Sequence, residues 1–227
     1  MVATGTSKGI GRAVAMHYLH AGWIVIGASR GPGSIESACY HHHSVDVRDE
    51  GSVKQMFTAT RRRFGRVDAL VNNAGIASMN HTLLTPVETV KRITDTNVTG
   101  TFLCSREAAK MMRRRLFGRI VNFASVAVPL AVEGESAYAA SKAAVITLSR
   151  VLARELGPHG ITVNVVGPGP VRTDMTSSIP EEKLEQLLAR LPLAQYTKIR
   201  DITNVIDFFL RPESDAVTGQ VVYLGGA

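Results

Sequence analysis

The residues with the clearest chemical pattern lie between positions 125 and 142, where a serine, a tyrosine and a lysine follow one another. Tyr138 and Lys142 are four residues apart, and residues at this spacing lie on one face of a helix. Alanines surround the pair and favour a helix, so we expect the phenol and the ammonium to lie side by side. An adjacent positive charge favours the phenolate, so we predict that Lys142 lowers the pKa of Tyr138 from its usual value of about 10. Such a phenol would exchange a proton near neutral pH.

The same spacing occurs by chance on surface helices, so the pair must be considered with the rest of the chain. A glycine-rich turn at Gly5, Gly9 and Gly11 follows a short apolar start and precedes an amphipathic segment that ends at Gly22. A strand, a glycine turn and a helix in this order direct backbone N–H groups and the positive end of the helix at a phosphate. The spacing GxxxGxG departs from the GxGxxG dinucleotide fingerprint. The turn therefore indicates a nucleotide site without defining it.

Apolar runs alternate with helical patterns along the whole chain, without a linker or an internal repeat. We expect strands near residues 1–4, 23–28, 44–47, 67–71, 120–124, 161–166 and 217–224, and helices near 12–22, 50–65, 86–115, 138–156 and 200–210. This alternation predicts an α/β fold: a Rossmann-like, doubly wound parallel sheet of about seven strands, with helices on both faces. We expect residues 1–227 to form a single dinucleotide-binding and catalytic domain.

The end of the second predicted strand bears on the choice of dinucleotide. An acidic residue at this place would bind the ribose 2′-hydroxyl of NAD. The chain has Arg30 instead, whose planar guanidinium suits the 2′-phosphate of NADP, and Lys8 could add a second positive charge. We therefore expect NADPH or NADP rather than NAD. The alternative is an ordinary solvated arginine.

Composition narrows the class of protein. The 227 residues carry a formal net charge of +7, with 45% hydrophobic and 6% aromatic residues. The charge suggests an anionic partner, but the basic residues are not interleaved with aromatics, so we expect no nucleic acid. No apolar run is long enough to span a membrane and no secretory signal is visible, so we expect a cytoplasmic enzyme. His41, His42 and His43 are adjacent and cannot converge on one point of a strand, so we expect no metal site.

Seven features, in this order and spacing, resemble the short-chain dehydrogenase/reductase family, and they cover essentially the whole chain. They are TGTSKGIG at residues 4–11, Asp46-Val47, NNAG at 72–75, Asn97, Ser125, YAASK at 138–142 and Pro168-Gly169.

The resemblance implies roles for the catalytic residues. Tyr138 would donate a proton to a ketone or accept one from an alcohol, and Lys142 would lower the pKa of Tyr138 and hold the nicotinamide ribose. Ser125 would bind the substrate oxygen. Asn97, which is unfavourable in the middle of a helix, would hold a water in a proton relay behind Lys142.

The resemblance also implies a set of cofactor-binding residues. They are the glycine turn with Gly5, Ser7, Lys8, Gly9, Ile10 and Gly11 for the pyrophosphate, Asp46 and Val47 for the adenine, Asn73, Ala74 and Gly75 for the adenosine ribose and the floor, and Pro168, Gly169, Val171 and Thr173 for the carboxamide and phosphate side, beside Arg30, Tyr138 and Lys142.

Within the family, residues 154–176, 188–196 and 217–226 are most similar to bacterial 3-oxoacyl-(acyl-carrier-protein) reductases. This similarity implies NADPH-dependent reduction of a 3-oxoacyl thioester that an acyl carrier protein bears, in a homotetramer or dimer built through the helices near 97–115 and 138–156. One alternative is reduction of a free small ketone, or oxidation of an alcohol, as in secondary metabolism. A more distant alternative is a dinucleotide sensor without catalysis.

Three further stretches of the chain bear on how a substrate or partner would reach the site. Arg113–Arg115 and Arg119 are expected near the approach to the active site, where they would suit an acidic carrier protein, although a solvated helix end is an equal alternative. Residues 180–196 are expected to form a lid over the substrate. The loop at 129–136 faces the substrate and carries no distinctive signature.

Overall fold

The structure is a computed structural model that describes residues 1–173, 176 and 181–227. Within them, seven strands form one sheet in the order β3-β2-β1-β4-β5-β6-β7, and every neighbouring pair is parallel. The predicted doubly wound sheet is confirmed. The strands are β1 (Val2–Thr4), β2 (Val25–Ser29), β3 (Tyr40–Ser44), β4 (Ala69–Asn72), β5 (Gly118–Phe123), β6 (Ile161–Gly167) and β7 (Val221–Tyr223).

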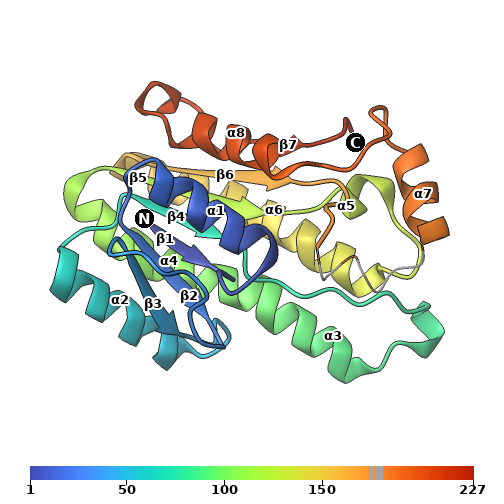
Figure 1. The fold of residues 1–227 in the computed structure, drawn as a ribbon, viewed down its shortest axis with the longest axis horizontal. Helices are drawn as coiled ribbons and strands as arrows, with labels where there is room; N and C mark the ends of the chain where they lie inside the picture. The colour runs from blue at the N-terminus through green and yellow to red at the C-terminus, as the bar shows by residue number, and fades with distance from the viewer. Residues whose placement is uncertain (174–175, 177–180) are drawn as a thin grey trace.

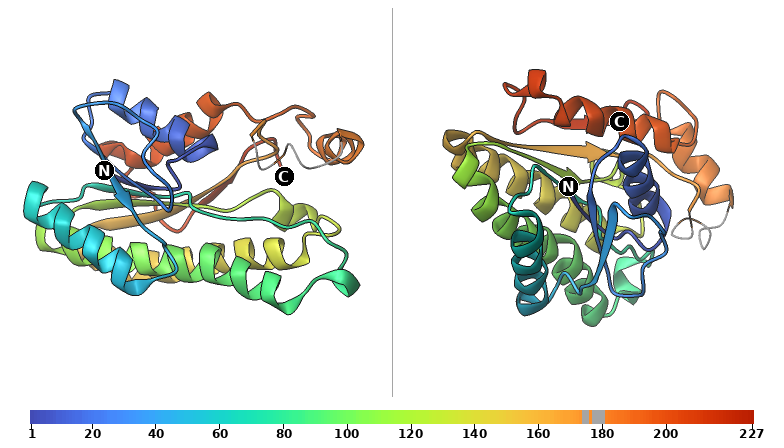
Figure 2. Two further views of the ribbon diagram at one scale, coloured as in Figure 1. Left: turned by 60° about the horizontal axis from the view of Figure 1, so that its bottom comes forward. Right: turned by 60° about the vertical axis from the view of Figure 1, so that its left-hand side comes forward.

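Helices cover both faces of the sheet. The main ones are α1 (Gly9–His20), α2 (Glu50–Phe64), α3 (Val87–Thr94), α4 (Gly100–Met112), α5 (Ala127–Leu130), α6 (Ser136–Leu156), α7 (Glu181–Ala189) and α8 (Ile199–Leu210). The left view of Figure 2 shows α1 and α8 on one side of the sheet and α2, α4 and α6 on the other. Figure 1 shows α7 at one end of the molecule, beside the C-terminus.

The strands are apolar because both sides of the sheet are buried. Val2, Leu70 and Ile120 face the core beneath α2, α4 and α6, whereas Ala3 and Val121 face the core beneath α1 and α8. A strand buried on both sides has no reason to alternate polar and apolar residues. The predicted apolar runs are therefore the central strands.

Two predicted elements differ in detail. The third strand begins at Tyr40, so that the three adjacent histidines are half-buried within β3 at the edge of the sheet. The predicted helix at 86–115 is α3 and α4 joined by a π-helical turn at Asp95–Thr99. None of the helices in the described parts of the chain is both long and apolar enough to cross a membrane.

Candidate active site

The strand order reverses between β1 and β4, because β1 leads outward to β2 whereas the chain returns through β4 on the other side. In open parallel sheets, ligands bind at the carboxyl ends of the strands beside such a point. A cavity of about 710 Å³ lies there. Its walls come from the glycine turn, the ends of β2, β4, β5 and β6, and the start of α6.

The glycine turn is shaped by close backbone approaches. Gly5 and Gly9 have φ values of +73° and +58°, in the left-handed region that favours glycine. A side chain on Gly11 would collide with the Gly5 carbonyl and the Asn73 amide. Asn73 donates to the carbonyl oxygen of Thr4 at 3.0 Å, which ties the end of β4 to the end of β1. The turn therefore keeps the start of α1 open to the cavity, which Gly9 and Ile10 line.

The ends of β2 and β3 bring charged side chains to the cavity wall. Arg30 is exposed and lines the cavity, with Asp46 and Arg48 beside it. The Arg48 guanidinium donates to both carboxylate oxygens of Asp46. Its Nε donates to Oδ1 at 2.9 Å, and its Nη2 donates to Oδ2 at 2.6 Å. This pair holds the pKa of Asp46 below its usual value, and the Arg30 charge adds to the effect. Arg48, which the sequence analysis did not select, thus brings a second guanidinium to the place where a 2′-phosphate would bind.

Ser125, Tyr138 and Lys142 come together in the cavity wall. Ser125 follows the end of β5, and the other two residues lie in the first two turns of α6. The Lys142 Nζ lies 5.8 Å from the centre of the Tyr138 ring and donates to the Phe123 carbonyl oxygen at 2.8 Å. The predicted side-by-side placement of the phenol and the ammonium is confirmed.

The prediction that the pKa of Tyr138 is lowered is wrong when only the groups of the protein are considered. Burial raises the pKa of Tyr138 to about 12, with a further increase from the Glu135 charge, and the interaction with Ser125 only partly offsets it. Burial also lowers the pKa of Lys142 to about 8. Sequence spacing placed the two groups correctly but could not show how strongly both are desolvated, and desolvation opposes the charged form of each.

Asn97 lies behind these residues in the π-helical turn and is buried. Its side-chain nitrogen donates to the Ile76 carbonyl oxygen at 3.0 Å and to the Ser141 hydroxyl at 2.9 Å, and its oxygen accepts from the Ile76 backbone nitrogen at 2.9 Å. A side chain at Gly75 would press on Asn97 and come into contact with Lys142. The position of an asparagine in the middle of a helix is thus explained, because its side-chain amide is fixed by hydrogen bonds and joins α6 to the loop after β4.

The cavity gathers nearly all of the residues selected from the sequence. Gly5, Ser7, Lys8, Gly9, Ile10, Arg30, Asp46, Val47, Asn73, Ala74, Gly75, Ser125, Tyr138, Lys142, Pro168, Gly169, Val171 and Thr173 line it. Gly11 and Asn97 do not: Gly11 lies beneath the glycine turn and Asn97 behind Lys142. The roles assigned to all of the selected residues remain predictions.

The sequence analysis missed several residues of the cavity wall. Beside Arg48, the wall includes Met79, Glu135, Leu184 and Leu187. Leu184 and Leu187 lie on α7, in the stretch predicted to form a lid, of which Pro180 falls outside the described residues. Glu135 likewise lies in the loop at 129–136, which was expected to face the substrate, but nothing in the sequence distinguished it from the other residues of that loop.

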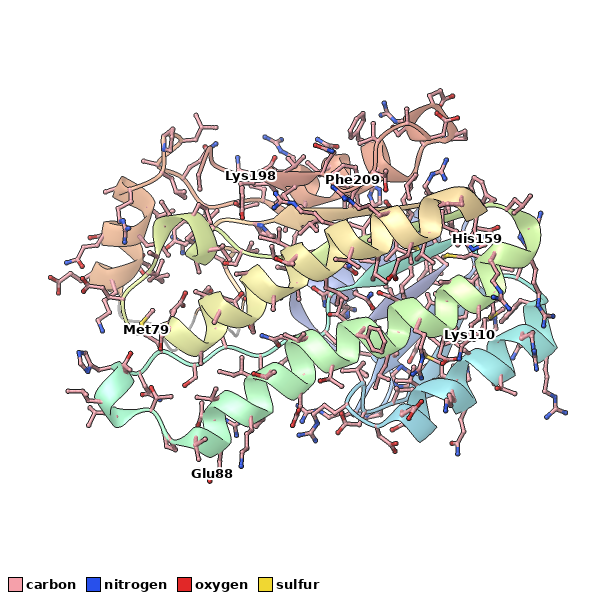
Figure 3. The ribbon with its side chains drawn as sticks, turned by 180° about the vertical axis from the view of Figure 1, so that it is seen from behind. Met79, Glu88, Lys110, His159, Lys198 and Phe209 are labelled. Atoms are coloured by element: carbon pink, nitrogen blue, oxygen red, sulfur yellow. The ribbon has the colours of Figure 1, made fainter. Side chains whose placement is uncertain are left out.

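The arginines expected at the approach to the active site lie elsewhere. Arg113–Arg115 precede β5, whereas Ser125 follows its last residue, so the whole strand separates them from Ser125. Arg119 is only 4% exposed and packs over Phe117. Figure 3 shows the same polarity along α6: Met79 lies beside its N-terminal end and His159 beside its C-terminal end. Within one protomer, these arginines therefore cannot contact a carrier protein that docks at the cavity.

The fold and the cavity define an α/β oxidoreductase that uses a nicotinamide dinucleotide. A family model described as enoyl-(acyl carrier protein) reductase matches residues 5–226, and the chain belongs to the short-chain dehydrogenase/reductase family. It is 35% identical to the 3-oxoacyl-(acyl-carrier-protein) reductase FabG of Staphylococcus aureus, over 99% of this chain and 96% of the relative. Identity to the FabG of Escherichia coli is 33%, over 99% and 95%.

Solved structures show the same fold. Levodione reductase superposes with a TM-score of 0.91 and 29% identity, over 99% of this chain and 95% of the other. Actinorhodin polyketide ketoreductase with NADPH gives 0.89 and 30%, with the same coverage, and ElxO with NADP bound gives 0.90 and 28%, over 98% and 95%.

The chain's own geometry fits such a dinucleotide. The positions that approach each other in the turn are glycines, so that backbone rather than side chains faces the cavity. Arg30 lies at the end of β2 and Arg48 follows β3, and the Ser125–Tyr138–Lys142 set lines the same cavity.

Proposed function

We propose that the chain catalyses the NADPH-dependent reduction of a 3-oxoacyl thioester, borne by an acyl carrier protein, to the 3-hydroxyacyl thioester. The observation that carries this proposal is the intact set of Ser125, Tyr138 and Lys142 in one cavity, in a chain whose curated relatives at 32–35% identity are named as such reductases. The complete set also argues against a sensor without catalysis.

In this proposal, the chain's residues orient the substrate and move a proton. When bound, the dinucleotide supplies the hydride, so the protein contributes position and proton transfer. The Ser125 hydroxyl and the Tyr138 phenol bind the ketone oxygen, and Tyr138 donates its proton to the alkoxide that forms. The high pKa of Tyr138 keeps the phenol protonated before turnover, as reduction requires. Lys142 holds the nicotinamide ribose, and Asn97 fixes the wall behind it.

The preference for NADPH rests on Arg30, with Lys8 and Arg48 near it in the same cavity wall. Two of the structural relatives are described with NADP or NADPH bound. An Arg30→Asp substitution should lower kcat/KM for NADPH by about tenfold to a hundredfold, the size of a lost charge-assisted phosphate contact, and leave that for NADH unchanged or higher. Arg12→Asp, an exposed position of α1 outside the cavity wall, is the matched control. An unchanged cofactor ratio in Arg30→Asp would contradict the assignment.

The proposed reaction is tested by NADPH oxidation with an acetoacetyl thioester, on a carrier protein and on a short thiol, against a panel of free ketones. Turnover of the thioester at a higher kcat/KM than the free ketones supports the proposal. Good turnover of a free ketone with none of the thioester would overturn it.

The second candidate function is reduction of a free cyclic or small ketone. The observation that favours it is the overall likeness to levodione reductase. The same panel of substrates separates the two functions.

We also propose that the chain forms a homotetramer or dimer. Figure 3 shows α4 and α6 side by side on the outer face, with no further layer over them. Phe102 on α4 and Val151 on α6 are 39% and 47% exposed. Large apolar side chains on an uncovered helix pair are typical of a surface that a second copy buries.

A further inference from the structure

The loop before α6 places a carboxylate in the wall of the cavity. Glu135 lies three residues before Tyr138, at the N-cap position of α6, and lines the cavity together with Ser125 and Tyr138. Residues at this spacing on a helix are neighbours. The residue as a whole is only 8% exposed.

The helix does not need this carboxylate. An N-cap side chain ordinarily accepts from a backbone N–H of the first turn, but the Glu135 side chain makes no such bond. Its backbone is fixed independently: its nitrogen donates to the Val132 carbonyl oxygen at 3.2 Å, and its carbonyl oxygen accepts from the Ala139 nitrogen at 2.7 Å. Among the described residues, no hydrogen bond or ion pair to the carboxylate is formed.

The carboxylate oxygens are not among the fully enclosed polar atoms of the described residues that lack a partner, and the residue lines the cavity. A largely buried carboxylate that faces a cavity without a partner in the described part of the chain points to a role in the cavity rather than in folding. Burial raises its pKa to about 7, so at pH 8 the group is mostly ionised. Its negative charge adds a small increase to the pKa of Tyr138, after the larger effect of burial, as expected for two groups in the same cavity wall. The same field must reach any charged atom that a substrate places beside the reacting oxygen.

We propose that Glu135 selects substrates by charge, excluding 3-oxo acids, whose carboxylate is one methylene away from the reacting carbonyl, and admitting their neutral esters and thioesters. This inference rests on the proposed function, because a 3-oxoacyl thioester and a free 3-oxo acid differ at this group. In the thioester, a neutral sulfur replaces the charged oxygen. Like charges roughly 5–6 Å apart, at an effective dielectric constant of about 20, discriminate by about a hundredfold.

The test compares a neutral and an anionic substrate that share one ketone. NADPH oxidation is measured at pH 8 with ethyl acetoacetate and with acetoacetate, for the wild type and for Glu135→Gln and Glu135→Lys. The wild type should prefer the ester by about a hundredfold in kcat/KM. The Gln variant should lower this ratio about a hundredfold, because it removes the charge, and the Lys variant should lower it further, mainly through a lower KM for acetoacetate.

Glu133 offers a matched control, because it is an exposed acid of the same loop that does not line the cavity. Glu133→Gln and Glu133→Lys should leave the ester-to-acid ratio unchanged. A merely structural role of Glu135 would lower kcat/KM for both substrates by the same factor, and that result would overturn the inference.

A wild type without preference for the ester, including one that reduces neither compound, would also overturn the inference. The proposed function fails separately. If the wild type reduces the ester and the Glu135 variants change the ratio, but no acetoacetyl thioester is reduced, then thioester reduction is wrong and charge selection stands.

Discussion

At the scale of single residues, Tyr138 and Lys142 show how far spacing determines chemistry. The four-residue spacing put the two groups side by side, as expected. It gave the wrong direction for the pKa of Tyr138, because the pKa depends on how much water each group keeps after folding. The protonated phenol that results is suited to an enzyme that works as a reductase.

A Tyr138→Phe substitution should therefore lower kcat for ketone reduction by at least about a thousandfold, within the usual contribution of a positioned general acid. The ring remains, so the NADPH dissociation constant should change less than threefold. Tyr223→Phe, in β7 outside the cavity wall, is the control. Near-normal turnover by Tyr138→Phe, measured by NADPH absorbance, would remove the phenol from the proton transfer.

Glu135 also has a predictable effect on stability. Its pKa is about 7 in the folded chain against an ordinary value of 4.5, so the unfolded state ionises more readily. Below about pH 4.5 both states are protonated and the residue has no effect; as the pH rises from 4.5 to 7, the folded state loses stability. Glu135→Gln should thus raise the free energy of unfolding at pH 8 by about 1–3 kcal/mol and have little effect near pH 4.5.

Urea denaturation at the two pH values measures this difference, and Glu133→Gln serves as the exposed control. A Gln variant that is less stable than the wild type at pH 8 would mean that the Glu135 carboxylate has a partner in the folded chain.

At the scale of elements, most of the fold could be predicted because the central apolar runs are strands buried on both sides. The ends of β1, β2, β4 and β5 fall within a few residues of their predicted positions, and the motifs that follow them meet at one cavity. The features that could not be predicted depend on which residues, distant in the sequence, surround a side chain in the fold. Arg113–Arg115 were placed near the site although β5 separates them from it, and Glu135 was overlooked because nothing in its neighbours shows that it is enclosed.

The shape of the glycine turn is sensitive to the addition of one carbon atom. A Gly11→Ala side chain would collide with the Gly5 carbonyl and with the Asn73 amide, which is itself bonded to Thr4. Relieving the collision must move the turn or break the tie between β1 and β4. We expect a loss of about 2–4 kcal/mol in the free energy of unfolding and at least tenfold weaker NADPH binding.

Gly157→Ala is the matched control, because a side chain there would meet nothing within 4 Å and no left-handed φ is required. Calorimetry and fluorescence titration give the two quantities. If Gly11→Ala bound NADPH as the wild type does, the close packing of the turn would not be needed for the cofactor.

At the scale of the whole molecule, α4 and α6 connect the cavity to an outer surface. The inner face of α6 carries Tyr138 and Lys142, while Ala140, Ala144, Thr147 and Val151 form an exposed stripe along the same helix. A helix that positions the site on one side and pairs with a second copy on the other would be held rigid by assembly. Rigidity matters here because proton transfer depends on sub-ångström placement.

A Val151→Glu substitution should therefore dissociate the assembly, since burying an unpaired carboxylate at an interface costs several kcal/mol. Sedimentation velocity should show a tetramer or dimer for the wild type and a smaller species for the variant. Ile24→Glu, which adds the same charge at an exposed residue before β2, should leave the assembly intact.

If α6 depends on assembly for its rigidity, Val151→Glu should also lose kcat while it still binds NADPH, because the glycine turn and Arg30 lie on other elements. A monomeric wild type with full activity would show instead that the packing of α6 on β5 and β6 is sufficient to hold Tyr138 in place.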